Sequence, residues 1–245
     1  DLTTAEVYVA AVLADDKALM DVFRSGGNFH STIAHKVFKL PCEVEEVAEL
    51  YSDRRQAAKA VTFGIMYGAG PAKISEQVTK DSGKYFSKKE AAEVIGDYFD
   101  AFHKLKAWIE RNQKFILANG FTYSHFGRKR RLPNVKSTDQ GIRSHSVRSG
   151  LNFLVQSAAS DINLLGAIDM GEFIKEQNMK SKIFALVHDS ILAEVPDDEV
   201  DFYCEILQKF VQKDRGIYIT GAPVGCDFDI GNDYSMGKFE KLYGD

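Results

Sequence analysis

The chain has 245 residues, of which 44% are hydrophobic and 27% are charged, and its formal net charge at pH 7 is −4. This length and composition predict one large globular domain or two small ones, with enough apolar material for a buried core. No apolar run approaches the roughly 20 residues that a membrane-spanning helix needs, and the chain opens on a polar stretch, so we expect neither a membrane span nor a signal peptide. Three widely spaced cysteines fit no zinc or disulfide framework and indicate a reducing compartment.

The predicted elements describe an α+β chain with many helices and a small antiparallel sheet. Helices are expected at residues 3–23, 30–38, 43–51, 53–67, 71–79, 88–117, 141–178 and 198–211, with an interruption near Gly150. Strands are expected at 121–126, 130–132, 183–187 and 191–195, and near 217–219 and 224–228.

Four residues in the helix predicted at 53–67 stand four positions apart: Arg55, Lys59, Phe63 and Tyr67. A step of four keeps side chains on one slowly drifting stripe of a helix, and two like charges at this spacing repel each other. The stripe suits a ligand with an anionic end and a flat end, such as a nucleoside triphosphate. The alternative is an ordinary amphipathic helix whose aromatic residues point into a core, because helical periodicity usually indicates burial.

Two further features leave alternatives open. Asp189 stands between two apolar runs, where a carboxylate needs compensation, either from hydrogen bonds within a turn or from Mg²⁺, which prefers one or two carboxylates. The segment 128–148 carries many basic side chains and a single acid, Asp139. It is either a solvated loop or a strip that faces a phosphate backbone.

Taken together, these residues and others resemble the motifs of the C-terminal polymerase region of the family A DNA polymerases. The ordered matches span nearly the whole chain. They are Asp1 and Glu6 of motif A; Asn28-Phe29-His30, continued by Ala34 to Phe38; Arg55, Lys59, Phe63, Gly64, Tyr67 and Gly68 of motif B; Gly127, Arg128, Leu132 and Pro133; Arg148, Asn152 and Gln156; and His188-Asp189 of motif C.

The resemblance implies a polymerase palm, a small antiparallel sheet with helices, together with a helical fingers subdomain. Residues 1–24 would be a palm segment with motif A, residues 25–125 the fingers with the motif B helix at 53–68, and residues 126–245 the palm with the motif C hairpin at 183–195. We expect the thumb and exonuclease domains to lie outside this chain, which would be a fragment of a larger polymerase or the catalytic half of a split one.

The resemblance also implies template-directed DNA synthesis by two-metal-ion nucleotidyl transfer, in replication or repair. Asp1, Asp189 and the Leu2 carbonyl would bind two Mg²⁺ ions, with Mn²⁺ as an alternative, and Lys59 would assist as a catalytic acid. The implied nucleotide-binding residues are Glu6, His30, Arg55, Lys59, Phe63 and Tyr67. The implied DNA-binding residues are Arg128, Arg148, Asn152, Gln156 and His188.

The implied partners are primer-template DNA, dNTPs, and the N-terminal remainder of the polymerase or a processivity factor, with no membrane. The implied location is the cytoplasm of a bacterial cell or a phage-infected host.

The sequence departs from the family pattern at Ser190, where a Glu usually follows the motif C Asp, and at Thr3-Thr4-Ala5, where motif A usually has Ser-Gln-Ile. Ser190 favours one alternative, a single-subunit RNA polymerase, whereas Glu6 and Phe63 oppose it, because RNA synthesis needs room at the 2′-hydroxyl. Another alternative is a non-catalytic chain that only binds DNA or partner subunits.

Overall fold

A computed structural model describes residues 2–233, and within them the chain divides into two compact units. The described part of the smaller unit comprises residues 2–4, Ile162–Lys213 and 224–233, and the larger unit comprises Ala5–Asp161 and Asp214–Pro223. Helices and short antiparallel strand pairs confirm the α+β class. Within the described residues, none of the helices is both long and apolar enough to cross a membrane.

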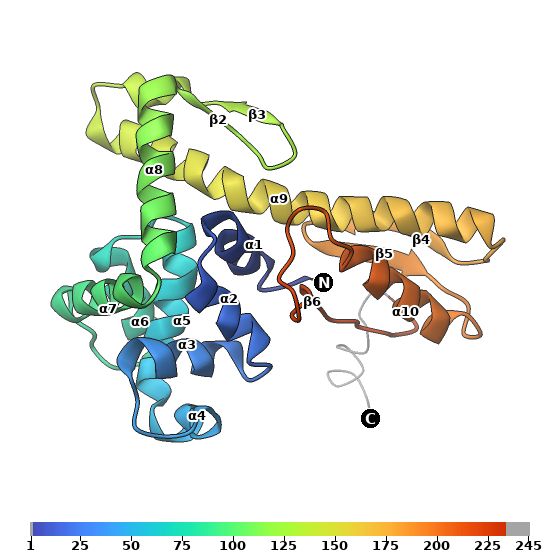
Figure 1. Cartoon of the computed structure of the whole chain (residues 1–245), viewed down its shortest axis with the longest axis horizontal. Helices are drawn as coiled ribbons and strands as arrows, with labels where there is room; N and C mark the ends of the chain where they lie inside the picture. The colour runs from blue at the N-terminus through green and yellow to red at the C-terminus, as the bar shows by residue number, and fades with distance from the viewer. Residues whose placement is uncertain (1, 234–245) are drawn as a thin grey trace. The chain divides into compact units, whose positions relative to one another are not determined.

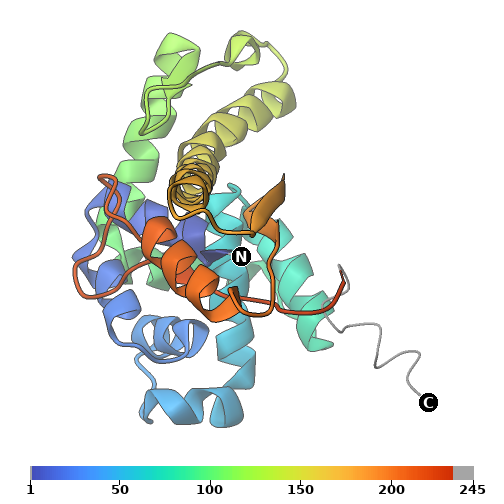
Figure 2. The ribbon, with the colours of Figure 1, turned by 90° about the vertical axis from the view of Figure 1, so that its right-hand side faces the viewer.

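The larger unit is mostly helical (Figure 1). It contains α1 (Ala5–Ala14), α2 (Lys17–Arg24), α3 (Phe29–Phe38), η1 (Val44–Glu46), α4 (Val47–Leu50), α5 (Ser52–Met66), α6 (Pro71–Ser82), α7 (Lys88–Ala101), α8 (His103–Asn119), β2 (Phe121–Tyr123), β3 (Lys129–Arg131), η2 (Pro133–Lys136) and the first part of α9 (Gln140–Glu176). Helix α5 packs against α1, α3, α6 and α7, so it lies at the centre of the helical cluster. Figure 2 shows α8 and the beginning of α9 as two separate helices, and residues 120–139, which include the β2–β3 hairpin and η2, connect them.

The smaller unit contains two strand pairs and a helix beside the last part of α9. Strand β1 (Leu2–Thr3) pairs antiparallel with β6 (Gly225–Cys226), and β4 (Lys182–Val187) pairs antiparallel with β5 (Ser190–Glu194). Helix α10 (Val200–Val211) packs so closely on α9 that a methyl group at Gly166 would lie 2.7 Å from Val211 Cγ2. In place of the strands predicted near 217–219 and 224–228, the structure has an isolated Ile219–Ala222 bridge and the two-residue β6.

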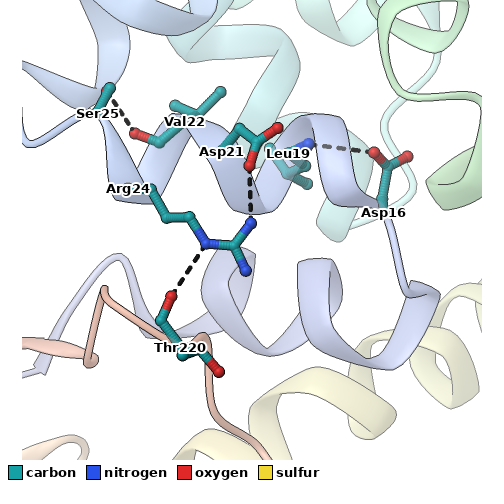
Figure 3. Close-up of polar contacts among 7 residues, drawn as sticks. All are labelled: Asp16, Leu19, Asp21, Val22, Arg24, Ser25 and Thr220. Carbon is teal, nitrogen blue, oxygen red and sulfur yellow. Dashed lines mark hydrogen bonds and ion pairs between the residues drawn. The ribbon is translucent and has the colours of Figure 1, made fainter.

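The single helix predicted at 3–23 is wrong: it is divided into α1 and α2. Asp15 has a φ of 50°, which ends α1, and Asp16 then caps α2 by accepting a hydrogen bond from the Leu19 N–H at 3.1 Å (Figure 3). Figure 3 also shows Arg24, in the last turn of α2, donating to Asp21 and to the Thr220 carbonyl.

The single helix predicted at 88–117 is also wrong, because Phe102 separates α7 from α8. Phe102 is fully buried with a non-helical backbone, and the second carboxylate oxygen of the buried Asp16 accepts from the Leu105 N–H at 2.9 Å, in the first turn of α8. One carboxylate therefore caps two helices that are distant in sequence.

The interruption predicted near Gly150 is absent, since α9 continues through it. A Cβ at Gly150 would lie 2.4 Å from Leu132 Cδ1 and 3.0 Å from Ile116 Cδ1. Glycine is therefore required there for close packing. Beside it lies a small core of Ile116, Leu132, Val135 and Val147.

Candidate nucleotide and metal site

The row of residues on α5 lies on the accessible side of the helix. The buried side consists of Ala57, Ala58, Val61, Thr62, Ile65 and Met66. Lys59 is exposed, Arg55 and Phe63 are half-buried, and Tyr67, just beyond the helix, is 47% exposed. The interpretation that the aromatic residues of the row point into a core is therefore wrong for Tyr67 and only partly right for Phe63.

His30, in the first turn of α3, extends this row. Its ring centroid lies 5.5 Å from that of Phe63 in an edge-on arrangement. Burial, assisted by the positive charges of Lys59 and Arg55, lowers the pKa of His30 from 6.5 to about 4. The ring is therefore neutral at pH 7. Its Nδ1 is buried and has no hydrogen-bond partner.

Neutral groups hold the Arg55 guanidinium. Its Nε donates to Ser31 Oγ at 3.2 Å, and one terminal nitrogen donates to Asn28 Oδ1 at 3.3 Å. Asn28 Oδ1 also accepts from the Ser31 N–H at 3.1 Å and caps α3. Among the described residues Arg55 forms no ion pair, so no carboxylate offsets its charge. The sequence did not predict Ser31 for this site, although Asn28 is a recognisable N-cap residue whose side chain accepts from the backbone N–H three residues later.

Tyr67 connects the row to α1. Its hydroxyl donates to Glu6 Oε1 at 3.1 Å. Gly68, which follows, has a φ of +67°, and a Cβ there would lie 2.5 Å from Cγ of Arg148. Only glycine meets both requirements, because other residues rarely adopt this conformation and any side chain would displace Arg148. The larger unit thus brings together all the predicted nucleotide-binding residues, Glu6, His30, Arg55, Lys59, Phe63 and Tyr67.

The predicted DNA-binding residues of the larger unit differ in accessibility. Gln156 is exposed, whereas Asn152 Oδ1 is buried without a hydrogen-bond partner. Arg128 forms an ion pair with Asp161 at 2.7 Å and donates to the Ser157 carbonyl at 3.2 Å. Asp161, which the sequence did not single out, therefore offsets the charge of Arg128.

Two of the predicted metal residues, Leu2 and Asp189, belong to the smaller unit. His188 and Asp189 form the exposed turn between β4 and β5, with Val187 opposite Ser190 and a φ of 56° at His188. Leu2 lies in β1, and Asp1 lies outside the described residues. Among residues 2–233, no three His, Cys, Asp or Glu side chains form a cluster that could hold a metal ion. The exposed Asp189 carboxylate nevertheless suits a hard cation such as Mg²⁺.

Comparisons with known proteins identify the family that the chain resembles. The family model for DNA polymerase family A matches residues 1–236. The chain is 48% identical over 268 aligned positions to the DNA polymerase of Escherichia phage T5, covering 99% of this chain and 31% of that protein. It is 34% identical to DNA polymerase I of Caldicellulosiruptor bescii, covering 85% of this chain and 23% of that one. The chain therefore spans less than a third of the length of these relatives.

A solved structure is also similar: the POL domain of Pol1 from M. smegmatis in complex with DNA primer-template and dNTP. The TM-score is 0.79 at 26% identity, and the match covers 92% of this chain and 37% of that one.

Proposed function

The chain belongs to DNA polymerase family A, and on this premise we propose that it is the nucleotide-selecting and metal-binding part of an enzyme that adds dNTPs to a primer on a DNA template. The observation that carries the proposal is the row along α5. Two cations, the half-buried Phe63 and the exposed Tyr67 lie on one side of a helix whose opposite side forms the core. The neutral His30 of α3 lies beside Phe63. The complex of the M. smegmatis domain with primer-template and dNTP supports the same partners for this chain.

Each side chain has a role that follows from its chemistry. Lys59 and Arg55 bind the anionic triphosphate, and Lys59 donates a proton to the leaving pyrophosphate. Asn28 and Ser31 orient Arg55 without offsetting its charge. Phe63 and Tyr67 pack against the incoming sugar and base. Glu6, held by Tyr67, occupies the space that a 2′-hydroxyl needs and so excludes ribonucleotides.

Asp189 and Asp1, with the Leu2 carbonyl, would hold two Mg²⁺ ions. Such ions would lower the pKa of the primer 3′-hydroxyl and offset the charge that develops on the phosphates. Ser190 leaves this site with one acid fewer than the usual family pattern.

The fingers are proposed at residues 25–125, and the palm at 1–24 and 126–245. Arg148, Asn152, Gln156 and His188 would contact the sugars and phosphates of primer-template DNA, largely independently of base sequence. Arg128, which pairs with Asp161, would act mainly by holding its hairpin on α9. The chain would function together with the rest of a longer polymerase.

Nucleotide binding by the chain itself tests the α5 row. With a fluorescent dNTP and Mg²⁺, Lys59→Gln should weaken binding about 10- to 100-fold, because a hydrogen bond to a charged group contributes roughly 1.5–3 kcal/mol. Lys80→Gln, which removes an exposed charge from α6, is the matched control. Equal affinities for the two variants would show that the row does not bind the triphosphate.

Primer extension by the full-length polymerase tests the chemistry. Asp189→Ala should abolish extension while DNA binding persists, and unchanged extension would rule out the two-metal assignment. Glu6→Ala should raise incorporation of rNTPs relative to dNTPs. If that ratio stayed constant, Glu6 would not be the residue that excludes the 2′-hydroxyl.

A further inference from the structure

The β2–β3 hairpin presents one face to α9 and a different face outward. In the antiparallel register Phe121 is opposite Arg131 and Tyr123 is opposite Lys129, so these four side chains share one face. Thr122 and Arg130 occupy the other face. Thr122 is 2% exposed, and Arg130 donates to Ser149 of α9 at 2.7 Å. The side that carries Thr122 and Arg130 therefore holds the hairpin in place, whereas the opposite side is available.

Aromatic rings form a continuous row on this outer side. The Phe115 ring, from the last part of α8, lies 5.7 Å from that of Phe121, which lies 5.4 Å from that of Tyr123. Phe115 is 42% exposed and Tyr123 is 49% exposed. Single exposed aromatic residues are common, but a contiguous row of accessible rings usually marks an interaction site.

Basic side chains lie on the same face as the row. The Lys129 ammonium lies 3.9 Å from the Phe121 ring centroid and 5.5 Å from that of Tyr123. Residues 111–138 contain no Asp or Glu, and their basic side chains are Arg111, Lys114, Arg128, Lys129, Arg130, Arg131 and Lys136. Only Arg128 among them forms an ion pair within the described residues. Because Asp161 offsets Arg128, and Arg130 lies on the face toward α9, Lys129 and Arg131 are the cations that the register places beside the row, and they attract an anionic ligand.

Rings and cations together indicate which polyanion fits. Bases of a single strand can stack on exposed aromatic rings while their phosphates meet Lys and Arg side chains. A duplex keeps its base faces stacked internally and would use only the cations. An acidic peptide would likewise leave the row of rings without a role. We propose that Phe115, Phe121, Tyr123, Lys129 and Arg131 form a binding face for single-stranded nucleic acid, separate from the α5 row.

Fluorescence anisotropy with the chain and a labelled single-stranded oligothymidylate tests this binding face. Tyr123→Ala should weaken binding at least about fivefold, since one base stacked on one ring contributes a factor of this order or more. Tyr85→Ala, which removes a tyrosine that is 83% exposed in the segment between α6 and α7, should leave the affinity unchanged. Neither variant touches the nucleotide site, so the result is independent of the proposed polymerase activity.

Two further measurements separate stacking from phosphate attraction. An abasic oligonucleotide of equal length should bind wild-type protein more weakly than oligothymidylate and should not distinguish Tyr123→Ala from wild type. Photo-crosslinking with an iodouracil oligonucleotide should label residues within 115–131. The proposal is overturned if the abasic strand binds equally well, if the variants at 123 and 85 behave alike, if crosslinks fall elsewhere, or if duplex or an acidic peptide binds with the same dependence on Tyr123.

Discussion

Replacing Gly64 by alanine should destabilise the protein, whereas the same replacement at Gly96 should stabilise it. Both glycines lie in helix interiors, Gly64 in α5 and Gly96 in α7. A Cβ at Gly96 would have no neighbour within 4 Å, but one at Gly64 would lie 2.2 Å from Ile74 Cδ1. Helices α5 and α6 are therefore in contact through the missing side chain of Gly64.

The magnitudes follow from two opposing terms. Alanine in a helix interior is favoured over glycine by about 0.5–1 kcal/mol, which both variants gain. Overpacking in a well-packed region costs about 1–3 kcal/mol, which only Gly64→Ala suffers. The difference between the two variants isolates this steric cost, so Gly64→Ala should be less stable than Gly96→Ala by about 1–3 kcal/mol.

Urea unfolding, followed by circular dichroism, measures this difference, and Ile74→Val provides a rescue. Valine lacks the clashing Cδ1, and the nearest remaining atoms to the new Cβ lie at 3.3 Å and 3.6 Å. Ile74→Val alone should lose about 0.5–1.5 kcal/mol. In the double variant the two losses should not add, and the coupling should recover most of the steric cost. If Gly64→Ala were as stable as Gly96→Ala, or if the two changes were additive, the close approach of α5 and α6 would be refuted.

Three other predictions concern side chains that contact more than one segment of the fold. The pKa of His30 lies near 4, below the 6.5 of the unfolded chain, so the free energy of unfolding should fall as the pH drops from 6.5 towards 4. His30→Gln should flatten this pH dependence in unfolding measured at several pH values. An unchanged pH dependence would contradict the burial of the His30 ring. Asp16→Ala should lower the free energy of unfolding in urea by about 1–4 kcal/mol, because it removes the caps at both Leu19 and Leu105. A decrease smaller than the roughly 0.5–2 kcal/mol of a single cap would refute the shared role. The pKa of Glu199 is lowered, chiefly by the hydrogen bond from the Lys180 backbone N–H, so the stabilising effect of its carboxylate should be present at neutral pH and be lost as the pH falls below 4.5. Glu199→Gln should remove this pH dependence of the free energy of unfolding in acid titrations. Identical acid transitions in the variant and the wild type would contradict the stabilising role of the carboxylate.

Much of the local structure was predictable from the sequence, because its signals are local. The apolar runs around His188-Asp189 predicted the β4–β5 hairpin and its polar turn. The glycines after Tyr67 predicted the end of α5. Motif spacing identified the family, which the family model confirms over residues 1–236.

Long-range contacts decided the rest. The sequence did not predict the breaks at Asp15 and Phe102, because both depend on how Asp16 meets α8 across 89 residues. Gly150 resembles a helix breaker until its packing against Leu132 is known. The basic segment from Arg128 appeared uniform in sequence, but Asp161 offsets one of its charges.

The α5 row shows the same division. Its four-residue spacing placed Arg55, Lys59, Phe63 and Tyr67 on one stripe, because helix geometry alone requires it. The spacing did not determine whether that stripe is buried. The tertiary structure decided this, since the opposite face of α5 packs among α1, α3, α6 and α7, and the row is left accessible beside His30 and Glu6.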